Sequence, residues 1–256
     1  MLDSSIITLF FIPLALCWGS FLNMLGYRLV HDRSILAKRS QCPRCNTIIA
    51  WYDNIPVISW LLLRGRCRQC KKPISLLYPL IELLTLVVLY AVYTCVDHQF
   101  FVAYFLFASA LIITIRSDLE TMLISRFVSL YAVPVGIVCG AFGLLPIGPV
   151  DSVTGALFGY GLFWCIATAF YHFTGKHGLG QGDIDLLAFI GSFTGIIGCW
   201  ATMLIGSIAG SVVGIVALLC TKQGLQTRIP FGPFLALGAI YYILVQQKIH
   251  ALLLGF

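Results

Sequence analysis

Charged side chains are scarce in this sequence. Asp, Glu, Lys and Arg together make up only 10% of the 256 residues, whereas 59% of the residues are apolar. A soluble domain is usually about one quarter charged. A chain with so few charges cannot cover a water-facing surface, so the composition excludes an ordinary soluble domain. The sequence also lacks an internal repeat, a coiled-coil heptad pattern and a low-complexity tract.

The apolar residues form runs that are long enough to cross a membrane, which requires about 20 residues. The run over 184–219 is too long for one crossing, and Gly195 and Gly198 offer a turn near its middle, so we divide it in two. The sequence therefore predicts an all-α polytopic membrane protein with about eight transmembrane helices. The other expected helices cover 6–27, 76–96, 100–115, 127–145, 153–171 and 231–245.

Most of the basic residues lie in one predicted loop. Ten of the 16 Lys and Arg residues fall between positions 28 and 72. Short basic loops stay in the cytoplasm, so we expect the N-terminus outside and, after eight crossings, only Lys248 on the outer side. The net charge of +6 then reflects membrane orientation and attraction to anionic lipid. We expect no nucleic-acid partner.

The same loop contains two Cys-x-x-Cys pairs, Cys42 with Cys45 and Cys67 with Cys70. Two such pairs predict a tetrahedral zinc site, and four sulfur ligands leave no open position, so the metal is structural. Zinc binding is worth about 10–16 kcal/mol in small peptides, which compensates for a loop too polar to bury a core. A redox dithiol or a pair of disulfides is disfavoured in the reducing cytoplasm. We expect residues 1–75 to form one region and 76–256 a helical bundle.

Four of the ten carboxylates lie at the predicted cytoplasmic edge of the membrane: Asp118, Glu120, Asp183 and Asp185. Intramembrane carboxylates are costly and indicate function by default, although an Asp that enters a helix is often only a cap. Two carboxylates brought close share a proton. One then acts as a base on a water molecule while the other polarises a scissile carbonyl.

Two glycines precede Asp183, in the order Gly180-Gln181-Gly182-Asp183. Glycine permits backbone conformations closed to other residues and allows another chain to approach closely. A glycine turn ending in an acid suits a site that holds an extended substrate. No Ser-His-Asp or Cys-His arrangement in the sequence competes with this site.

At these residues the chain resembles the type IV prepilin peptidases, called leader peptidase/N-methyltransferases when they are bifunctional. The resemblance covers nearly the whole chain, and G-x-G-D alone would be a weak signal. The matching motifs are Gly19-Ser20-Phe21-Leu22-Asn23, Tyr27-Arg28-Leu29, Asp53-Asn54-Ile55-Pro56, Leu63-Arg64-Gly65, Tyr78-Pro79 with Glu82, Gly180-Gln181-Gly182-Asp183, and Pro230-Phe231-Gly232-Pro233-Phe234.

The resemblance implies that Asp118 and Asp183 are the catalytic pair of an aspartyl endopeptidase in the bacterial inner membrane. Such an enzyme cleaves the short basic leader of type IV prepilins or pseudopilins after a glycine, on the cytoplasmic side. Bifunctional members then methylate the new N-terminus with S-adenosylmethionine, an activity associated with the cysteine-bearing N-terminal region.

The chain departs from the family pattern at two places. Asp185 stands where a lysine is usual, and Ser125-Arg126 stands where a Pro-Asp pair is usual. Asp185 either raises the carboxyl pKa values of the pair or attracts the basic leader, and the sequence leaves both open.

Two other functions are compatible with parts of the sequence. A proton-coupled transporter would explain Asp118 and Asp183 but not the cysteine loop. A non-enzymatic assembly scaffold would use the zinc lobe to dock partners.

Overall fold

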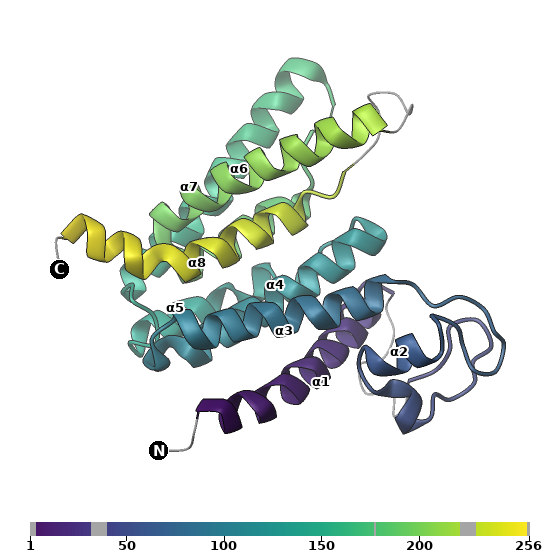
Figure 1. Ribbon diagram of the computed structural model, residues 1–256. Coiled ribbons are helices and arrows are strands. Elements are labelled where there is room, and N and C mark those ends of the chain that lie inside the picture. Colours follow the sequence, from purple (N-terminus) through teal and green to yellow (C-terminus); the bar gives the residue numbers. More distant parts are fainter. Residues whose placement is uncertain (1–3, 32–39, 177, 221–228, 255–256) are drawn as a thin grey trace. The chain divides into compact units, whose positions relative to one another are not determined.

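The computed structural model describes residues 4–31, 40–176, 178–220 and 229–254 (Figure 1). Its described part contains helices and no strand, which confirms the predicted all-α fold. Six basic residues of the orientation argument, Arg33, Lys38, Arg39, Lys222, Arg228 and the side chain of Lys248, lie outside the described part. The longer helices are α1 Ser4–Val30, α3 Leu77–Cys95, α4 Phe101–Thr121, α5 Val133–Ala141, α6 Pro149–Thr174, α7 Gln181–Cys220 and α8 Gly232–Leu254, and the short ones are η1 Trp51–Asn54, α2 Ile58–Leu62, η2 His98–Phe100 and η3 Leu130–Ala132.

The helix lengths are those of a multi-pass membrane protein. Among the described residues, five helical stretches are long and apolar enough to cross a membrane: Leu9–Val30, Leu77–Cys95, His98–Thr121, Pro149–Thr174 and Gln181–Cys220. Shorter apolar helices cover Leu130–Ala141 and Gly232–Gln246. Together with the break inside α7 described below, these segments correspond loosely to the eight that the sequence predicts.

The predicted helix over 127–145 is wrong in its extent. The chain forms turns after Arg126, and α5 covers only nine residues, from Val133 to Ala141. A helix of nine residues rises about 14 Å, which is about half of the hydrocarbon thickness of a bilayer. Gly143, with φ of 68°, follows the end of α5, and a left-handed residue cannot continue a right-handed helix.

The break inside α7 agrees with the predicted division of the long apolar run. Gly195 has φ of 68° and ψ of −172°, which are not helical angles. Only glycine adopts this region without strain. The residue therefore interrupts α7 within the 195–198 segment where the sequence predicts a turn.

The chain divides into two compact units, Met1–Ala91 and Val92–Phe256. In the first unit, α1 and α3 pack closely at Gly19, where a Cβ would lie 2.9 Å from Cβ of Thr85. The amide of Asn23 donates a hydrogen bond of 3.0 Å to the carbonyl of Tyr78. Gly19, Asn23 and Tyr78 belong to motifs of the family resemblance, and here they hold two helices together.

Glu82 ties the polar loop of the first unit to α3. Its carboxylate accepts a hydrogen bond of 2.7 Å from the backbone amide of Val57, the residue before α2. Glu82 is buried, and a buried carboxylate is stable only where its charge is compensated by hydrogen bonds or opposite charge. The contact fixes the loop at the point where α2 begins.

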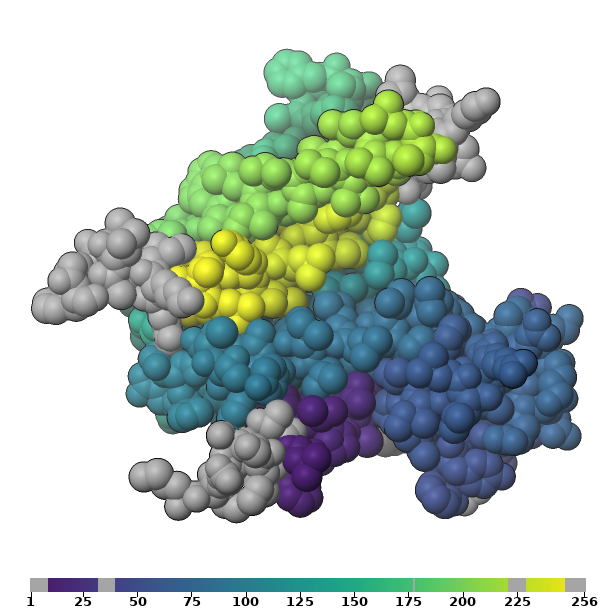
Figure 2. All heavy atoms as spheres, viewed as in Figure 1, coloured from purple at the N-terminus to yellow at the C-terminus, as the bar shows by residue number. Residues whose placement is uncertain are grey.

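In the second unit, α6 packs on α7, α7 packs on α8, and α4 packs on α8. The second part of α7 and α8 lie side by side on the face shown in Figure 2. A Cβ on Gly155 of α6 would meet the carbonyl oxygen of Gly191 in α7, and one on Gly159 would meet that of Leu187. Small residues at this spacing allow membrane helices to approach closely.

An aromatic cluster joins α4 to α7 in the centre of the second unit. The rings of Phe107 and Phe193 are stacked with centroids 4.7 Å apart, and Phe189 lies 5.3 Å from Phe107. Next to this cluster, the side-chain amide of Gln246 in α8 donates a hydrogen bond to the hydroxyl of Tyr104 in α4. These contacts hold α4 and α7, the two helices that carry the candidate catalytic aspartates, in one packed core.

Candidate active site and metal centre

The first cysteine pair lies on a tight turn. The amide of Cys42 donates to the carbonyl of Thr47 at 3.0 Å, and the amide of Asn46 donates back to the carbonyl of Cys42 at 2.9 Å. Asn46, directly after Cys45, has φ of 55°, a conformation that asparagine tolerates better than most residues. This turn brings the two thiols of the pair to one side of the loop.

The second pair repeats this geometry. The amide of Cys67 donates to the carbonyl of Lys72, and the amide of Lys71 donates to the carbonyl of Cys67, both at 3.0 Å. Lys71, directly after Cys70, has φ of 56°. The two halves of the loop are therefore built alike, as two Cys-x-x-Cys turns facing each other.

The four sulfur atoms converge at a distance suited to a metal. The Sγ atoms of Cys42, Cys45, Cys67 and Cys70 all lie within 4.8 Å of one another, and those of Cys42 and Cys70 are 3.9 Å apart. In a tetrahedral zinc site with Zn–S bonds of about 2.3 Å, the sulfurs are about 3.8 Å apart. The donor set and its spacing fit a structural metal ion, as the sequence predicts.

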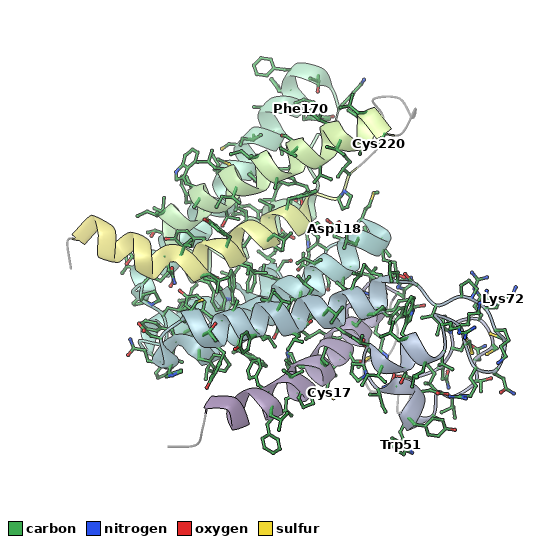
Figure 3. The ribbon with its side chains drawn as sticks, viewed as in Figure 1. Cys17, Trp51, Lys72, Asp118, Phe170 and Cys220 are labelled. Atoms are coloured by element: carbon green, nitrogen blue, oxygen red, sulfur yellow. The ribbon has the colours of Figure 1, made fainter. Side chains whose placement is uncertain are left out.

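A bidentate ion pair stabilises the cysteine-bearing loop, called the lobe below, beside its second cysteine turn. Arg68 donates to Asp53 through Nε at 2.8 Å and through Nη2 at 2.7 Å. The hydrogen bonds from Arg68 hold the pKa of Asp53 below its usual value. Trp51 and Lys72, which Figure 3 labels, are exposed residues of the same loop.

Asp118 lies in the last turn of α4 and is buried, with 4% of its surface exposed. Its Oδ2 accepts a hydrogen bond of 3.0 Å from the backbone amide of Gly232, the first residue of α8. Figure 3 shows Asp118 beside the beginning of α8. The helix ends nearby because Met122 adopts φ of 56° and donates its amide to the carbonyl of Asp118.

Asp183 lies in the first turn of α7 and is half-buried. Ile124, in the segment after α4, lies against both Gly182, the residue before Asp183, and Gly232, whose amide binds Asp118. The structure therefore brings together the two aspartates that the sequence singles out, although 65 positions separate them in the chain.

Two roles were expected for the glycines of the motif, an unusual backbone conformation and close approach of another segment, and the structure supports only close approach. Neither Gly180 nor Gly182 has a positive φ, so the expected need for a conformation closed to other residues is wrong. A Cβ on Gly182 would lie 2.9 Å from Cβ of Ile124, and one on Gly180 would lie 3.2 Å from Oδ2 of Asp183. The motif therefore needs glycine because the segment after α4 and the carboxylate itself approach so closely.

The other two edge carboxylates are engaged in ion pairs. Glu120 pairs with Nη1 of the fully buried Arg116 at 2.5 Å, one helical turn away. Asp185 is fully buried, and its Oδ2 accepts a hydrogen bond of 3.0 Å from Nε of Arg126 while its Oδ1 accepts one of 2.8 Å from the amide of Gln181. Both carboxylate oxygens of Asp185 therefore have partners within the protein, and its attraction for the basic leader stays a prediction.

Sequence reasoning missed the contacts of three residues around the pair. The amide of Gly232 belongs to a motif that carried no assigned role, and only the fold brings it to Asp118. Arg126 was recognised only as a departure from the family pattern, and Asp185 was given two alternative roles, neither of which is an ion pair with Arg126. Their opposite charges at the two departing positions were the available signal that they pair.

Two protein-family models match this chain, one over the cysteine region and one over the region of the two aspartates. The family model described as the Bacterial Peptidase A24 N-terminal domain matches residues 14–96, which include the four cysteines. The model described as the Type IV leader peptidase family matches residues 105–215, which include Asp118 and Asp183. A prepilin leader peptidase/N-methyltransferase of Aeromonas hydrophila is 38% identical, over 80% of this chain and 71% of the relative.

The chain belongs to the type IV leader peptidase family. Another relative, the prepilin leader peptidase/N-methyltransferase of Pseudomonas putida, is 34% identical over 95% of this chain and 93% of its own length. The likeness to members of the leader peptidase family thus includes both compact units. No solved structure matches the chain.

Proposed function

We propose that this protein is an aspartyl endopeptidase that removes the leader of type IV prepilins or pseudopilins, and that it also methylates the new N-terminus. The observation that carries the proposal is the convergence of Asp118 and Asp183, because Ile124 lies against both Gly232, whose amide binds Asp118, and Gly182, which precedes Asp183. Relatives named prepilin leader peptidase/N-methyltransferase over most of the chain support both activities.

The two carboxylates have the chemistry of an acid–base pair. Because like charges a few Å apart cannot both ionise, the pair holds one shared proton. The ionised member removes a proton from a water molecule, and the protonated member donates a hydrogen bond to the scissile carbonyl oxygen. The Gly232 amide binds Oδ2 of Asp118, and we assign the other oxygen, Oδ1, to the water or the substrate.

We place this pair at the cytoplasmic face of the bacterial inner membrane. The support is the basic loop that joins α1 to α3, because short basic loops stay in the cytoplasm. We also propose that Cys42, Cys45, Cys67 and Cys70 hold a zinc ion that stabilises the lobe. Such a metal has only sulfur ligands and no open position, so it supplies stability and no catalytic step.

The transporter and scaffold interpretations are weaker. Relatives of this chain are named as peptidases, and Asp118 accepts a backbone hydrogen bond at a helix end. A scaffold would keep its function after either aspartate is neutralised, whereas the peptidase would not.

The decisive experiment is cleavage of a purified prepilin in detergent or liposomes. We expect Asp118→Asn and Asp183→Asn each to abolish cleavage while methylation of a pre-cleaved pilin with S-adenosylmethionine continues, and unchanged thermal unfolding would show that the mutated unit still folds. Glu120→Gln is the matched control, because Glu120 pairs with Arg116, and it should retain cleavage. Near-wild-type cleavage by either Asn variant would overturn the assignment.

A further inference from the structure

Asp185 is a buried carboxylate whose partners come from two places in the chain. Its side chain is 1% exposed, and a buried charge requires compensation by an opposite charge or hydrogen bonds. Gln181, one turn earlier in α7, supplies one hydrogen bond. Arg126, which is 59 positions away, supplies the opposite charge from a side chain that is about half exposed.

Each partner in this network is close in sequence to a candidate catalytic group. Asp185 is two residues after Asp183 in the first turns of α7, and Gln181 is the variable residue of the Gly180–Asp183 motif. Arg126 is eight residues after Asp118, in the segment that follows α4. The ion pair therefore joins the segment after one aspartate to the helix that carries the other.

The segment after α4 also lies against two glycines, Gly182 and Gly232. Ile124 is the neighbour that a Cβ on Gly182 would meet, and its Cδ1 would lie 3.0 Å from a Cβ on Gly232. Gly232 in turn binds Asp118. A shift of this segment would therefore disturb the backbone beside Asp183 and the amide that holds Asp118.

We propose that the Arg126–Asp185 ion pair is a positioning element that clamps the segment after α4 against α7 and so sets the geometry of the Asp118–Asp183 pair. This inference rests on the proposed function.

The test is a charge-exchange cycle on the full-length protein with a purified prepilin. Arg126→Asp leaves two carboxylates facing each other and Asp185→Lys leaves two cations, so each should lower kcat by about tenfold or more, since small misplacements of reacting groups cost this much or more. KM should change less, because neither side chain is assigned to leader binding. The double variant, Arg126→Asp with Asp185→Lys, should recover kcat to within about threefold of wild type, as expected when the two changes are coupled.

Two further variants distinguish an effect of active-site positioning on kcat from effects of misfolding or of a changed net charge. Arg126→Lys keeps the charge and should retain most of the activity, and Lys176→Ala removes an exposed positive charge that has no contact with Asp185 and should leave kcat unchanged. Thermal stability and methylation of a pre-cleaved pilin serve as fold readouts for every variant.

The outcomes distinguish this proposal from the function on which it rests. Absence of prepilin cleavage by the wild-type protein would contradict the proposed function itself. If the wild type is active, two results would overturn the positioning role. One is a double variant whose kcat is no higher than that of the less active single variant. The other is single variants that keep the wild-type kcat. A raised KM for Asp185→Lys that the double variant fails to restore would instead assign Asp185 to leader binding.

Discussion

The backbone amide of Gly232 donates a hydrogen bond of 3.0 Å to Oδ2 of Asp118, which lies 114 positions earlier in the chain. Gly232 is the first residue of α8, so the carboxylate lies at the N-terminus of a helix. The free amides and the dipole at that end favour a negative charge. A motif near the end of the chain therefore helps to hold a candidate catalytic group that belongs to α4.

This contact predicts that Gly232→Ala inactivates the peptidase. A Cβ at position 232 would lie 2.7 Å from Oδ2 of Asp118 and 3.0 Å from Cδ1 of Ile124, so the carboxylate must move. We expect kcat for prepilin cleavage to fall by about 100-fold, as for a misplacement of about 1 Å. Gly161→Ala is the control, because a Cβ there meets nothing within 4 Å. Equal activities of the two variants would show that the contact is unimportant.

A second prediction concerns the metal centre. Elemental analysis of the purified protein should find one zinc ion per chain, and the double variant Cys45→Ser with Cys70→Ser should lose it. The lobe should then become sensitive to proteolysis, because a structural metal supplies much of the folding free energy of a small polar domain. Cys17→Ser, at an exposed position of α1, should keep the metal. Full zinc occupancy in the double variant would rule out these ligands.

A third prediction concerns the packing of α6 on α7. A Cβ on Gly155 would meet the Gly191 carbonyl oxygen and would lie 2.6 Å from Cα of Gly195, all of which are backbone atoms that cannot rotate away. We expect Gly155→Val to lower the free energy of unfolding by about 1–3 kcal/mol or more through overpacking. Thermal unfolding in detergent would measure the change. Gly161→Val, in the same helix but facing open space, should have little effect, and equal losses in both variants would contradict the proposed packing.

The Arg68–Asp53 pair makes a fourth prediction, on pH. The guanidinium holds the pKa of Asp53 below its usual value, which is about 4 in an unfolded chain. The ion pair therefore stabilises the lobe fully at pH values above the unfolded-state pKa of Asp53. That stabilisation is lost as the pH falls through the lower pKa of Asp53 in the folded state. The stability difference between wild type and Asp53→Asn should be constant near neutral pH and should shrink in acid.

Resistance of the lobe to proteolysis across a pH series would measure that difference. The Arg68→Ala background provides the control, since without Arg68 the Asp53→Asn change should have little effect at any pH. A difference between wild type and Asp53→Asn that stays constant into strong acid would contradict the assigned role of the ion pair.

Much of the architecture was predictable because it depends on local composition. Long apolar runs predict membrane helices wherever they occur, and a glycine within the long run marks the break that Gly195 makes in α7. The cysteine turns were likewise predictable, since each Cys-x-x-Cys turn is closed by hydrogen bonds between residues at most five positions apart. Local signals failed over 127–145, where apolar composition does not distinguish a membrane helix from turns followed by the short α5.

The sequence by itself determined which residues are candidates for chemistry: Asp118, Asp183 and the four cysteines. Only the tertiary structure decided how the carboxylates are held. The Gly232 amide reaches Asp118 across 114 positions, and Arg126 reaches Asp185 across 59. The physical reason is that a hydrogen bond or an ion pair depends on distance in space, and the distance between residues on different helices is set by how those helices pack. Residue type shows what a side chain is able to do, whereas packing determines which partner it meets.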